Sequence, residues 1–352
     1  MEEDGDTVGD EEKVGLGEVA RLAGVSMATV SRVVNRKAGV SPRAREAVER
    51  AIRETGFERP ASDGIVAVIT PSLSGAVFAA LAERISEALA PHGLRAVTCA
   101  ALPGGVQERD FVRSLLRLGI SGLVFLSASN TLEAADQETY QLLASHHVPF
   151  VCVNGRYDGR PSPAYSTDDA VAAEISVQHL YELGHRRIGL AAGPLGNKPA
   201  DRRVDGFLRA LERRGIDDPG GWVRRQGYSV EGGRSAAEYL LDRGATAVVA
   251  ASDTMALGVV RAARERQWPV PARVSVVGYD DSSLMEFTDP PLTTVRQPVD
   301  RLAAEAARGL VALIAGGEVP AEELMFRPEL VVRSTTAPCP ADDPLDSRYM
   351  TR

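Results

Sequence analysis

The chain has 352 residues, a length that fits two or three domains and excludes a single small module. Its 44% hydrophobic and 25% charged residues are ordinary for a globular protein, and its formal net charge is −8. No apolar run approaches the roughly 20 residues of a membrane span, and the acidic start is not a signal peptide, so we expect a cytoplasmic protein. The three cysteines and five histidines show no ligand spacing, so we expect no metal or cofactor.

Both ends of the chain are predicted to be disordered. Residues 1–13 carry seven carboxylates and almost nothing apolar, which is too little to offset the entropy of ordering. This acidic arm either is a solvated tail or competes with DNA phosphates for basic residues further along, and the composition favours the tail. Residues 338–352 are rich in proline and aspartate and are predicted to be a second disordered segment.

Residues 16–35, LGEVARLAGVSMATVSRVVN, have the pattern of two helices that cross at a tight turn. Ala20 allows close approach of the helices, Gly24 suits the left-handed turn position, and Ser26 is placed to cap the second helix. The valines of that helix, Val30 and Val33 or Val34, pack it on the first. The outward side chains are polar, small or basic, as a DNA major groove requires. A helical hairpin in some other kind of domain is the alternative.

The charge of this region favours the DNA-binding alternative. From Val14 to Pro60 nine basic residues stand against five acidic ones, a local charge of +4 in an acidic chain. A basic module on an acidic protein is typical of a phosphate-binding domain. Ser41 and Pro42 predict the start of a third helix that ends at Gly56, so three helices close a small core.

Residues 14–60 resemble the headpiece of the LacI–GalR family of repressors through the strings EVARLAGVSMATVSRVVN, VSPRAREAVERAI and TGF-x-x-P. The resemblance implies that Met27, Ala28 and Arg32 read bases. It also implies phosphate contacts for four polar residues, which are Ser26, Thr29, Ser31 and Asn35. Arg32 is able to make a bidentate contact with guanine, whereas Met27 and Ala28 offer only apolar contacts.

The linker after the headpiece differs from the family pattern. Most members carry a segment that folds as a hinge helix and wedges a leucine into the minor groove. Here only residues 61–64 separate Pro60 from the next predicted strand, and four residues are too few for a capped helix. We therefore expect no hinge helix. The short linker would instead transmit movement of the lobes directly to the headpiece.

Beyond Asp63 the pattern alternates between strands and helices, which predicts parallel sheets covered by helices on both faces. Strands are expected at residues 65–70, 94–100, 122–127, 148–154, 186–192, 222–225, 246–251 and 274–280. Helices are expected at residues 76–90, 111–118, 140–146, 170–183, 202–214, 229–243 and 255–266.

This part also resembles the LacI–GalR family, most strongly in STDDAVAAEISVQHLYELGHRRIGLAAGP, ASDTMALGVVRAARERQWPVP and VSVVGYDDSSL. The implied fold is a small all-α helix-turn-helix headpiece followed by a two-lobed α/β core like that of periplasmic binding proteins, with parallel sheets. The core spans 65–337. Its first lobe is about 65–165 plus 296–323, and its second is about 166–295 plus 324–337. The chain would then cross between lobes near Ser166, Val295 and Arg327, which makes a hinge suited to closure around a ligand.

Ligands of open α/β sheets bind beyond the carboxyl ends of the strands. Several side chains there match the effector-binding positions of the family, and the resemblance implies that these seven hold the ligand: Ser72, Phe78, Asn154, Arg203, Tyr228, Asp253 and Asp280. One arginine, two carboxylates, an amide and a ring suit a polyhydroxylated ligand, because planar donors and carboxylates bind vicinal hydroxyls and a ring covers an apolar sugar face.

Four of these residues have simpler interpretations. Asp253 is placed to cap the helix that follows it, and Asp280 to cap the turn after its strand. Phe78 equally suits the core, and Tyr228 equally suits packing between the lobes.

The sequence thus predicts a transcriptional regulator, most simply a repressor, that binds operator DNA and is controlled by a small polar effector. The expected effector is a carbohydrate. A homodimer is expected because one headpiece reads only a half-site, with apolar helices such as Val77–Leu89 as the contact face. Two alternatives are an enzyme, for which no catalytic motif is present, and a sugar receptor that does not bind DNA.

Overall fold

The computed structural model describes residues 16–34, 39–55, 64–101, 107–135, 138–157 and 161–340, which form two compact units divided after Asp63. The predicted acidic arm, the segment 56–63 where we expect no hinge helix, and residues 341–352 lie outside the described residues. Gly64, which we assigned to the linker, is the first residue of a strand.

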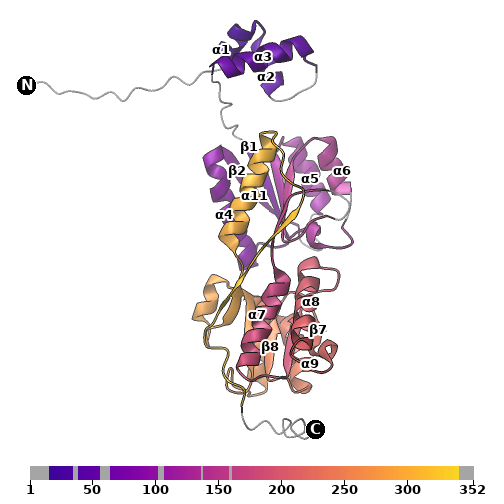
Figure 1. Cartoon of the computed structure of the whole chain (residues 1–352), viewed down its shortest axis with the longest axis vertical. Coiled ribbons are helices and arrows are strands. Elements are labelled where there is room, and N and C mark those ends of the chain that lie inside the picture. The colour runs from indigo at the N-terminus through magenta and orange to yellow at the C-terminus, as the bar shows by residue number, and fades with distance from the viewer. Residues whose placement is uncertain are drawn as a thin grey trace, which may run out of the picture. The chain divides into compact units, whose positions relative to one another are not determined.

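Within its described residues, the first unit has three helices (Figure 1): α1 (Leu16–Ala23), α2 (Met27–Val34) and α3 (Pro42–Thr55). Helix α3 begins as predicted, because Ser41 Oγ accepts the N–H of Ala44 at 3.3 Å. The three helices share a small apolar core of Val19, Ala20, Val30, Val33, Val48 and Ala51.

The second unit contains two six-stranded sheets, one in each lobe (Figure 1). The sheet of lobe 1 has the order β11-β5-β4-β3-β1-β2, and its strands are β1 (Gly64–Thr70), β2 (Leu94–Ala100), β3 (Gly122–Leu126), β4 (Phe150–Val153), β5 (Ala164–Thr167) and β11 (Glu323–Phe326). The sheet of lobe 2 has the order β12-β10-β9-β8-β6-β7, and its strands are β6 (Ile188–Ala192), β7 (Val223–Arg225), β8 (Ala247–Ala250), β9 (Ser275–Asp280), β10 (Thr293–Arg296) and β12 (Glu329–Val331). Neighbouring strands are parallel except β10 and β12, which are antiparallel.

Helices cover both faces of each sheet. In lobe 1 they are α4 (Ala76–Leu89), α5 (Glu108–Arg117), α6 (Glu138–Ser145) and α11 (Val299–Ile314), and in lobe 2 they are α7 (Asp169–Glu182), α8 (Lys198–Glu212), α9 (Val230–Asp242) and α10 (Asp253–Glu265). Short 3-10 helices are η1 (Ala90–His92), η2 (Ser129–Thr131), η3 (Pro219–Trp222) and η4 (Ser283–Phe287).

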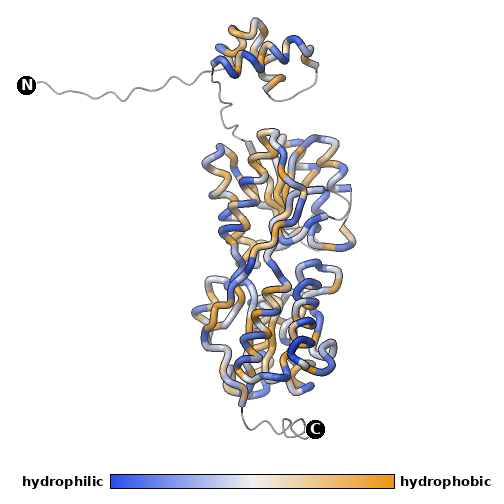
Figure 2. The backbone as a smooth tube through the Cα atoms, viewed as in Figure 1, coloured by the Kyte–Doolittle hydropathy of each residue, from blue (hydrophilic) through white to orange (hydrophobic). Residues whose placement is uncertain are grey.

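Strand β1 shows why the sheet of lobe 1 needs two helical layers. Val66 and Val68 face the core under α4 and α11, whereas Ala67 and Ile69 face the core under α5 and α6. Because both faces are buried, the strand is an almost continuous apolar run. Figure 2 shows the same pattern, with apolar residues gathered in the strands inside each lobe.

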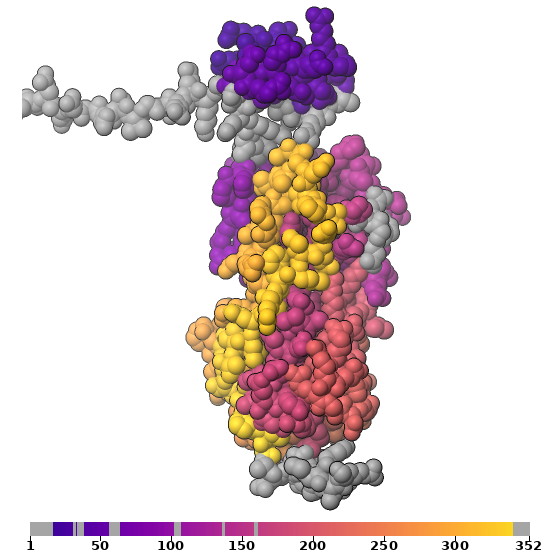
Figure 3. All heavy atoms as spheres, viewed as in Figure 1, coloured from indigo at the N-terminus to yellow at the C-terminus, as the bar shows by residue number. Residues whose placement is uncertain are grey.

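The chain crosses between the lobes three times. It passes from β5 to α7, from β10 to α11, and from β11 to β12. The last described segment, in yellow in Figure 3, runs along both lobes on the visible face. It ends on lobe 2, where the N–H of Cys339 donates to Leu183 O at 2.7 Å, so the ordered core continues beyond residue 337, where we expected the tail to begin.

The structure corrects two further predictions. Helix α8 begins at Lys198, four residues earlier than expected, because Asn197 caps it and Pro199 is tolerated in a first helical turn. The large apolar side chains of α4 are not available as a dimer face, because Val77, Leu81, Ile85 and Leu89 are buried in their own lobe.

Candidate DNA-binding and ligand-binding sites

The turn between α1 and α2 has the predicted geometry. Gly24 has φ 64°, a left-handed conformation that glycine adopts without strain, and the N–H of Val25 donates to Ala20 O at 3.1 Å. Ser26 Oγ then accepts the N–H of Thr29 at 3.2 Å, which caps α2. The chain therefore turns sharply from one helix into the next, as a helix-turn-helix requires.

The start of α2 presents a partly apolar surface. The side chain of Met27 is 62% exposed, and Ala28 is exposed beside it, whereas Thr29 is half-buried with its hydroxyl 3.0 Å from Ser26 Oγ. The side chains of Ser31 and Arg32, and all of Asn35, lie outside the described residues. The DNA contacts assigned to these seven residues stay predictions.

In lobe 2 the packing of α8 against α7 positions Arg203. Gly206 lies one turn after Arg203, and a Cβ atom at Gly206 would lie 2.4 Å from Ala170 O. Only glycine therefore lets the two helices approach this closely. The guanidinium of Arg203 is buried, with the residue 7% exposed.

The guanidinium of Arg203 is surrounded by three polar partners. Its Nη1 donates to Asp169 Oδ1, its Nη2 donates to Tyr228 Oη at 2.7 Å, and its centre lies 4.3 Å from the ring centroid of Tyr279. Tyr279 Oη also donates to Asp169 Oδ1 at 2.8 Å. Among the described residues, no atom accepts a hydrogen bond from Nε of Arg203. A buried donor without a partner is costly, which makes this position a candidate ligand contact.

Tyr228 is fixed by its hydroxyl and leaves its ring accessible. The hydroxyl also donates to Asn197 Oδ1 at 3.4 Å, and the residue is 42% exposed. Gly193, after β6, makes room for it, because a Cβ atom there would lie 2.4 Å from Tyr228 Oη. These contacts all lie within lobe 2, so they do not support our alternative that Tyr228 packs between the lobes.

A second chain of hydrogen bonds joins Asp280 to lobe 1. Gln297 Nε2 donates to Asp280 Oδ1 at 2.7 Å, and Thr167 Oγ1 donates to Gln297 Oε1 at 2.8 Å. The N–H of Thr167 donates to Asn154 Oδ1 at 3.3 Å, and Asn154 Nδ2 donates to Ser127 Oγ at 3.0 Å. Two predicted ligand residues, Asp280 and Asn154, are thus connected through two of the three crossings.

The backbone is strained where these strands end. Ser127, Asn154, Asp280 and Asp281 have φ values of 51°, 63°, 119° and 55°, which non-glycine residues rarely adopt. They follow or end β3, β4 and β9. Such conformations cost of order 1–3 kcal/mol each and cluster at functional sites.

Burial raises the pKa of several carboxyl groups here. The pKa of Asp280 is well above its usual range because the group is desolvated and Asp253 lies nearby, and burial likewise raises the pKa of Asp169. Burial raises the pKa of Asp253 to about 6. These carboxyl groups therefore retain protons more readily than exposed ones.

Asp253 and Asp280 do not cap the elements that we expected. Ser252 caps α10, since its Oγ accepts the N–H of Met255 at 3.1 Å. Asp253 instead accepts from Thr294 Oγ1 at 2.6 Å and from the N–H of Ser282 at 2.7 Å, so its carboxylate links three segments of lobe 2. Asp280 makes no capping bond to η4.

Ser72 and Phe78 have their contacts within lobe 1. Ser72 Oγ lies 2.8 Å from Ser74 Oγ, and Phe78 is half-buried against the core under α4 and α11. This supports the core interpretation of Phe78. The contacts of these two residues do not connect them to Arg203.

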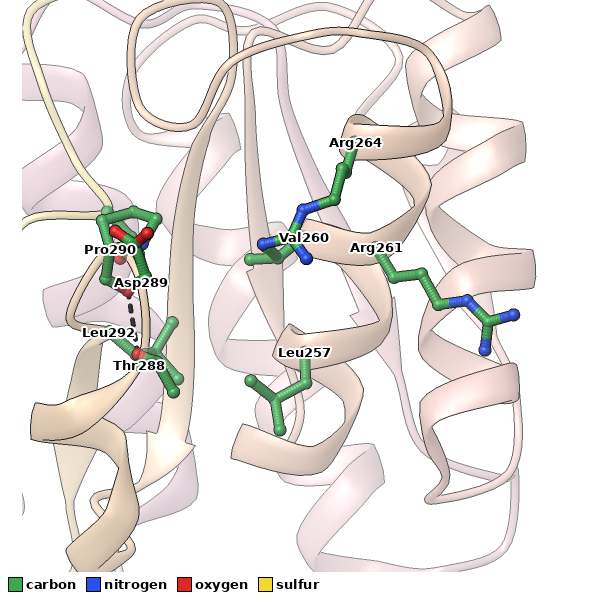
Figure 4. A pocket seen from close by; sticks show the side chains of 9 residues that line it. Leu257, Val260, Arg261, Arg264, Thr288, Asp289, Pro290 and Leu292 are labelled. Atoms are coloured by element: carbon green, nitrogen blue, oxygen red, sulfur yellow. Dashed lines mark hydrogen bonds between the residues drawn. The ribbon is translucent and has the colours of Figure 1, made fainter.

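A separate pocket lies in lobe 2 (Figure 4), with a volume of about 230 Å³. Its walls come from α10, from the loop after η4 and from the segment after β12, and they are Leu257, Val260, Arg261, Arg264, Thr288, Asp289, Pro290, Leu292 and Thr335. In Figure 4 Arg264 extends toward the pocket and Arg261 points away from it. None of the predicted ligand residues lines this pocket.

Across the described residues there is no cluster of side chains that would hold a metal ion, and no helix is long and apolar enough to cross a membrane. The buried His185 hydrogen-bonds Thr246 Oγ1 at 3.0 Å and Ser275 Oγ at 3.1 Å, so its role is in packing lobe 2.

Comparisons with known proteins identify the family. The model of the bacterial regulatory proteins of the lacI family matches residues 15–59, and that of the periplasmic binding protein-like domain matches residues 177–336. The HTH-type transcriptional regulator MalR of Streptomyces coelicolor is 43% identical over 336 residues, which cover 93% of this chain and 98% of that protein. This chain belongs to the lacI family. The predicted family and fold class are therefore confirmed.

Two solved lacI-family structures resemble more than nine-tenths of the chain. A complex of the transcriptional regulator CelR with cellobiose has a TM-score of 0.71 and 33% identity, covering 92% of this chain and 99% of that one. The lac repressor dimer bound to operator and the anti-inducer ONPF has a TM-score of 0.68 and 31% identity. The match covers 93% of this chain and 100% of that one.

Sequence reasoning missed Asp169 and Gln297. Asp168 caps α7, whereas the next residue, Asp169, points to Arg203. The sequence signal for Asp169 was its position in the first turn of a helix that follows β5, where the chain crosses from lobe 1 to lobe 2. Gln297 carried no signal of its own.

Proposed function

We propose that this lacI-family protein binds a two-fold operator as a dimer and that a small polyhydroxylated ligand, held between the lobes around Arg203, controls the affinity for that operator. The cytoplasm, where operator DNA is accessible, is the expected compartment. The DNA contacts come from the start of α2, where Met27 and Ala28 are exposed, and from Arg32 one turn later.

The unpartnered Nε of Arg203 is the single observation that carries the ligand part of this proposal. The same guanidinium is oriented by Asp169 and Tyr228, so its Nε–H has a fixed direction. A ligand hydroxyl or ring oxygen would supply the missing acceptor. The accessible ring of Tyr228 suits the apolar face of a sugar, and the carboxyl group of Asp280 suits a pair of its hydroxyls.

All seven predicted ligand residues keep a proposed role, but the roles differ. Arg203, Tyr228, Asp280 and Asn154 are proposed as ligand contacts or as their direct supports. Asp253 is proposed to hold the end of β9 in place through Ser282 and Thr294, and Ser72 and Phe78 to shape the wall of lobe 1.

For the dimer, lobe 2 offers an exposed apolar surface in place of α4. Phe287 and Leu284 in η4 are 77% and 69% exposed, and the loop that follows them lines the pocket of Figure 4. Large exposed apolar side chains beside an apolar hollow are typical of subunit contacts. Phe287→Ser is expected to shift the protein toward monomer in sedimentation experiments at micromolar concentration.

Two alternatives fit the observations less well. A sugar receptor without DNA binding would have no use for a folded helix-turn-helix with Ser26 capping α2. We infer that the chain is not an enzyme, because its relatives are named as transcriptional regulators.

Binding selection from fragmented host DNA, followed by mobility-shift assays, tests the proposal. We expect one or a few two-fold sites to be enriched and their retardation to change when cellobiose or another carbohydrate of a screened panel is added. Failure to enrich any site would contradict the DNA part, and enrichment without any carbohydrate effect would contradict the ligand part.

A further inference from the structure

The loop before α8 holds lobe 2 against lobe 1. The N–H of Glu133, in lobe 1, donates to Gly196 O, in lobe 2, at 3.0 Å. Asn197 Nδ2 donates to Thr131 Oγ1 at 3.2 Å across the same boundary. The helix that carries Arg203 is therefore fixed to lobe 1 at its first turn by uncharged hydrogen bonds.

A charged contact reinforces this boundary one turn further along α8. Arg202 Nη1 and Nη2 donate to Glu323 Oε1 and Oε2 at 2.8 and 2.6 Å, a bidentate arrangement between α8 of lobe 2 and the first residue of β11 in lobe 1. The Arg202 and Glu323 side chains are only 26% and 12% exposed. Such a pair is directional, because both hydrogen bonds need the guanidinium and carboxylate to stay coplanar.

Lobe 1 also orients the carboxylate from its own side. Ser166 Oγ, in β5, donates to Glu323 Oε1 at 2.6 Å. Burial opposes ionisation of Glu323, but the hydrogen bonds from Arg202 and Ser166 outweigh it and lower its pKa. Glu323 is thus held as a carboxylate in the position that Arg202 requires.

We propose that Arg202 and Glu323 form a latch that holds the two lobes together without ligand and so sets the resting balance between engaged and separated lobes. Arg202 precedes Arg203 on the same helix, so moving Arg203 away from lobe 1 also draws Arg202 from Glu323. The regulatory role of the latch rests on the proposed function, whereas the existence of the latch does not. The latch itself is testable without ligand or DNA.

Hydrogen exchange of the Glu133 amide in the full chain reads lobe separation directly, because its acceptor belongs to the other lobe. We expect Glu323→Gln and Arg202→Gln each to accelerate exchange at Glu133 by about tenfold, the scale of a partly exposed charge-assisted contact. Because the two residues act as one unit, the double variant should exchange no faster than either single variant.

Three controls separate a latch from general loosening. The amides of Ser127 and Gln226 donate within one lobe each, to Val153 O and Ala192 O, and should keep their rates. Glu87→Gln removes an exposed Arg84 pair within lobe 1 and should leave all three amides unchanged. An unchanged rate at Glu133, or equal acceleration of all three amides in the Glu323→Gln variant, would overturn the proposal.

Discussion

The Arg203–Asp169 pair predicts an asymmetric response to removing either partner. Asp169 is 1% exposed and Arg203 is 7% exposed, so each charge depends on the other for compensation. Asp169→Asn keeps an acceptor for Tyr279 but leaves a buried guanidinium, which has no means of losing its charge. Breaking a buried pair in this way costs about 3–5 kcal/mol of unfolding free energy.

Arg203→Met should cost less, and its cost should depend on pH. The carboxyl group left behind is able to take up a proton, since burial already raises the pKa of Asp169 and Arg203 is the largest influence that opposes this rise. A group whose pKa is raised in the folded state contributes most at low pH and loses that contribution as pH increases. The variant is therefore expected to be more stable, relative to wild type, near pH 5 than near pH 8.

Urea denaturation followed by circular dichroism measures both variants at the two pH values. We expect Asp169→Asn to be the less stable variant at pH 5, by about 2 kcal/mol or more. Equal stabilities, the reverse order, or a pH-independent cost for Arg203→Met would refute the interpretation of this pair as a buried, mutually compensated charge.

Three further predictions follow from single residues. Gly206→Ala forces α8 away from Ala170 O and should lower the unfolding free energy by about 1–3 kcal/mol in urea denaturation. Because burial raises the pKa of Asp253 from 3.8 to about 6, ionisation opposes folding as pH rises through this range. The stability advantage of wild type over Asp253→Asn should shrink by about 2 kcal/mol from about pH 4 to pH 8, and a constant difference would contradict the shifted pKa. Arg32→Ala should weaken operator binding by about 1–3 kcal/mol in mobility shifts, and equal loss on random DNA would refute a base-reading role.

Local patterns were enough to predict most elements of the fold. The run from Gly64 to Thr70 and the small residues around Gly24 place their elements through periodicity and turn chemistry alone. The short strands β5, β10, β11 and β12 were missed because three or four residues carry no periodic signal. Their place in the sheets comes from long-range pairing, which a single sequence does not encode locally.

The candidate site shows the same division. Arg203 was predicted from its match to an effector-binding position of the family, but its partner Asp169 lies 34 residues away and meets it only when α7 and α8 pack. Ser252 and Asp253 are both good capping residues by type. The choice between them was decided by Thr294, 41 residues from Asp253, because its Oγ1 donates to Asp253 Oδ1 in the folded lobe.

Operator affinity measured with and without a carbohydrate ligand, in wild type and in Arg203→Ala, tests the central claim most directly. The operator and ligand are those found by selection from host DNA and by the carbohydrate screen. We predict that the ligand changes operator affinity of the wild type by at least about tenfold, a coupling of ordinary size, and leaves that of Arg203→Ala unchanged. Both proteins should bind the operator equally when no ligand is present. A full ligand response in Arg203→Ala would contradict the claim that Arg203 links ligand binding to control of DNA binding.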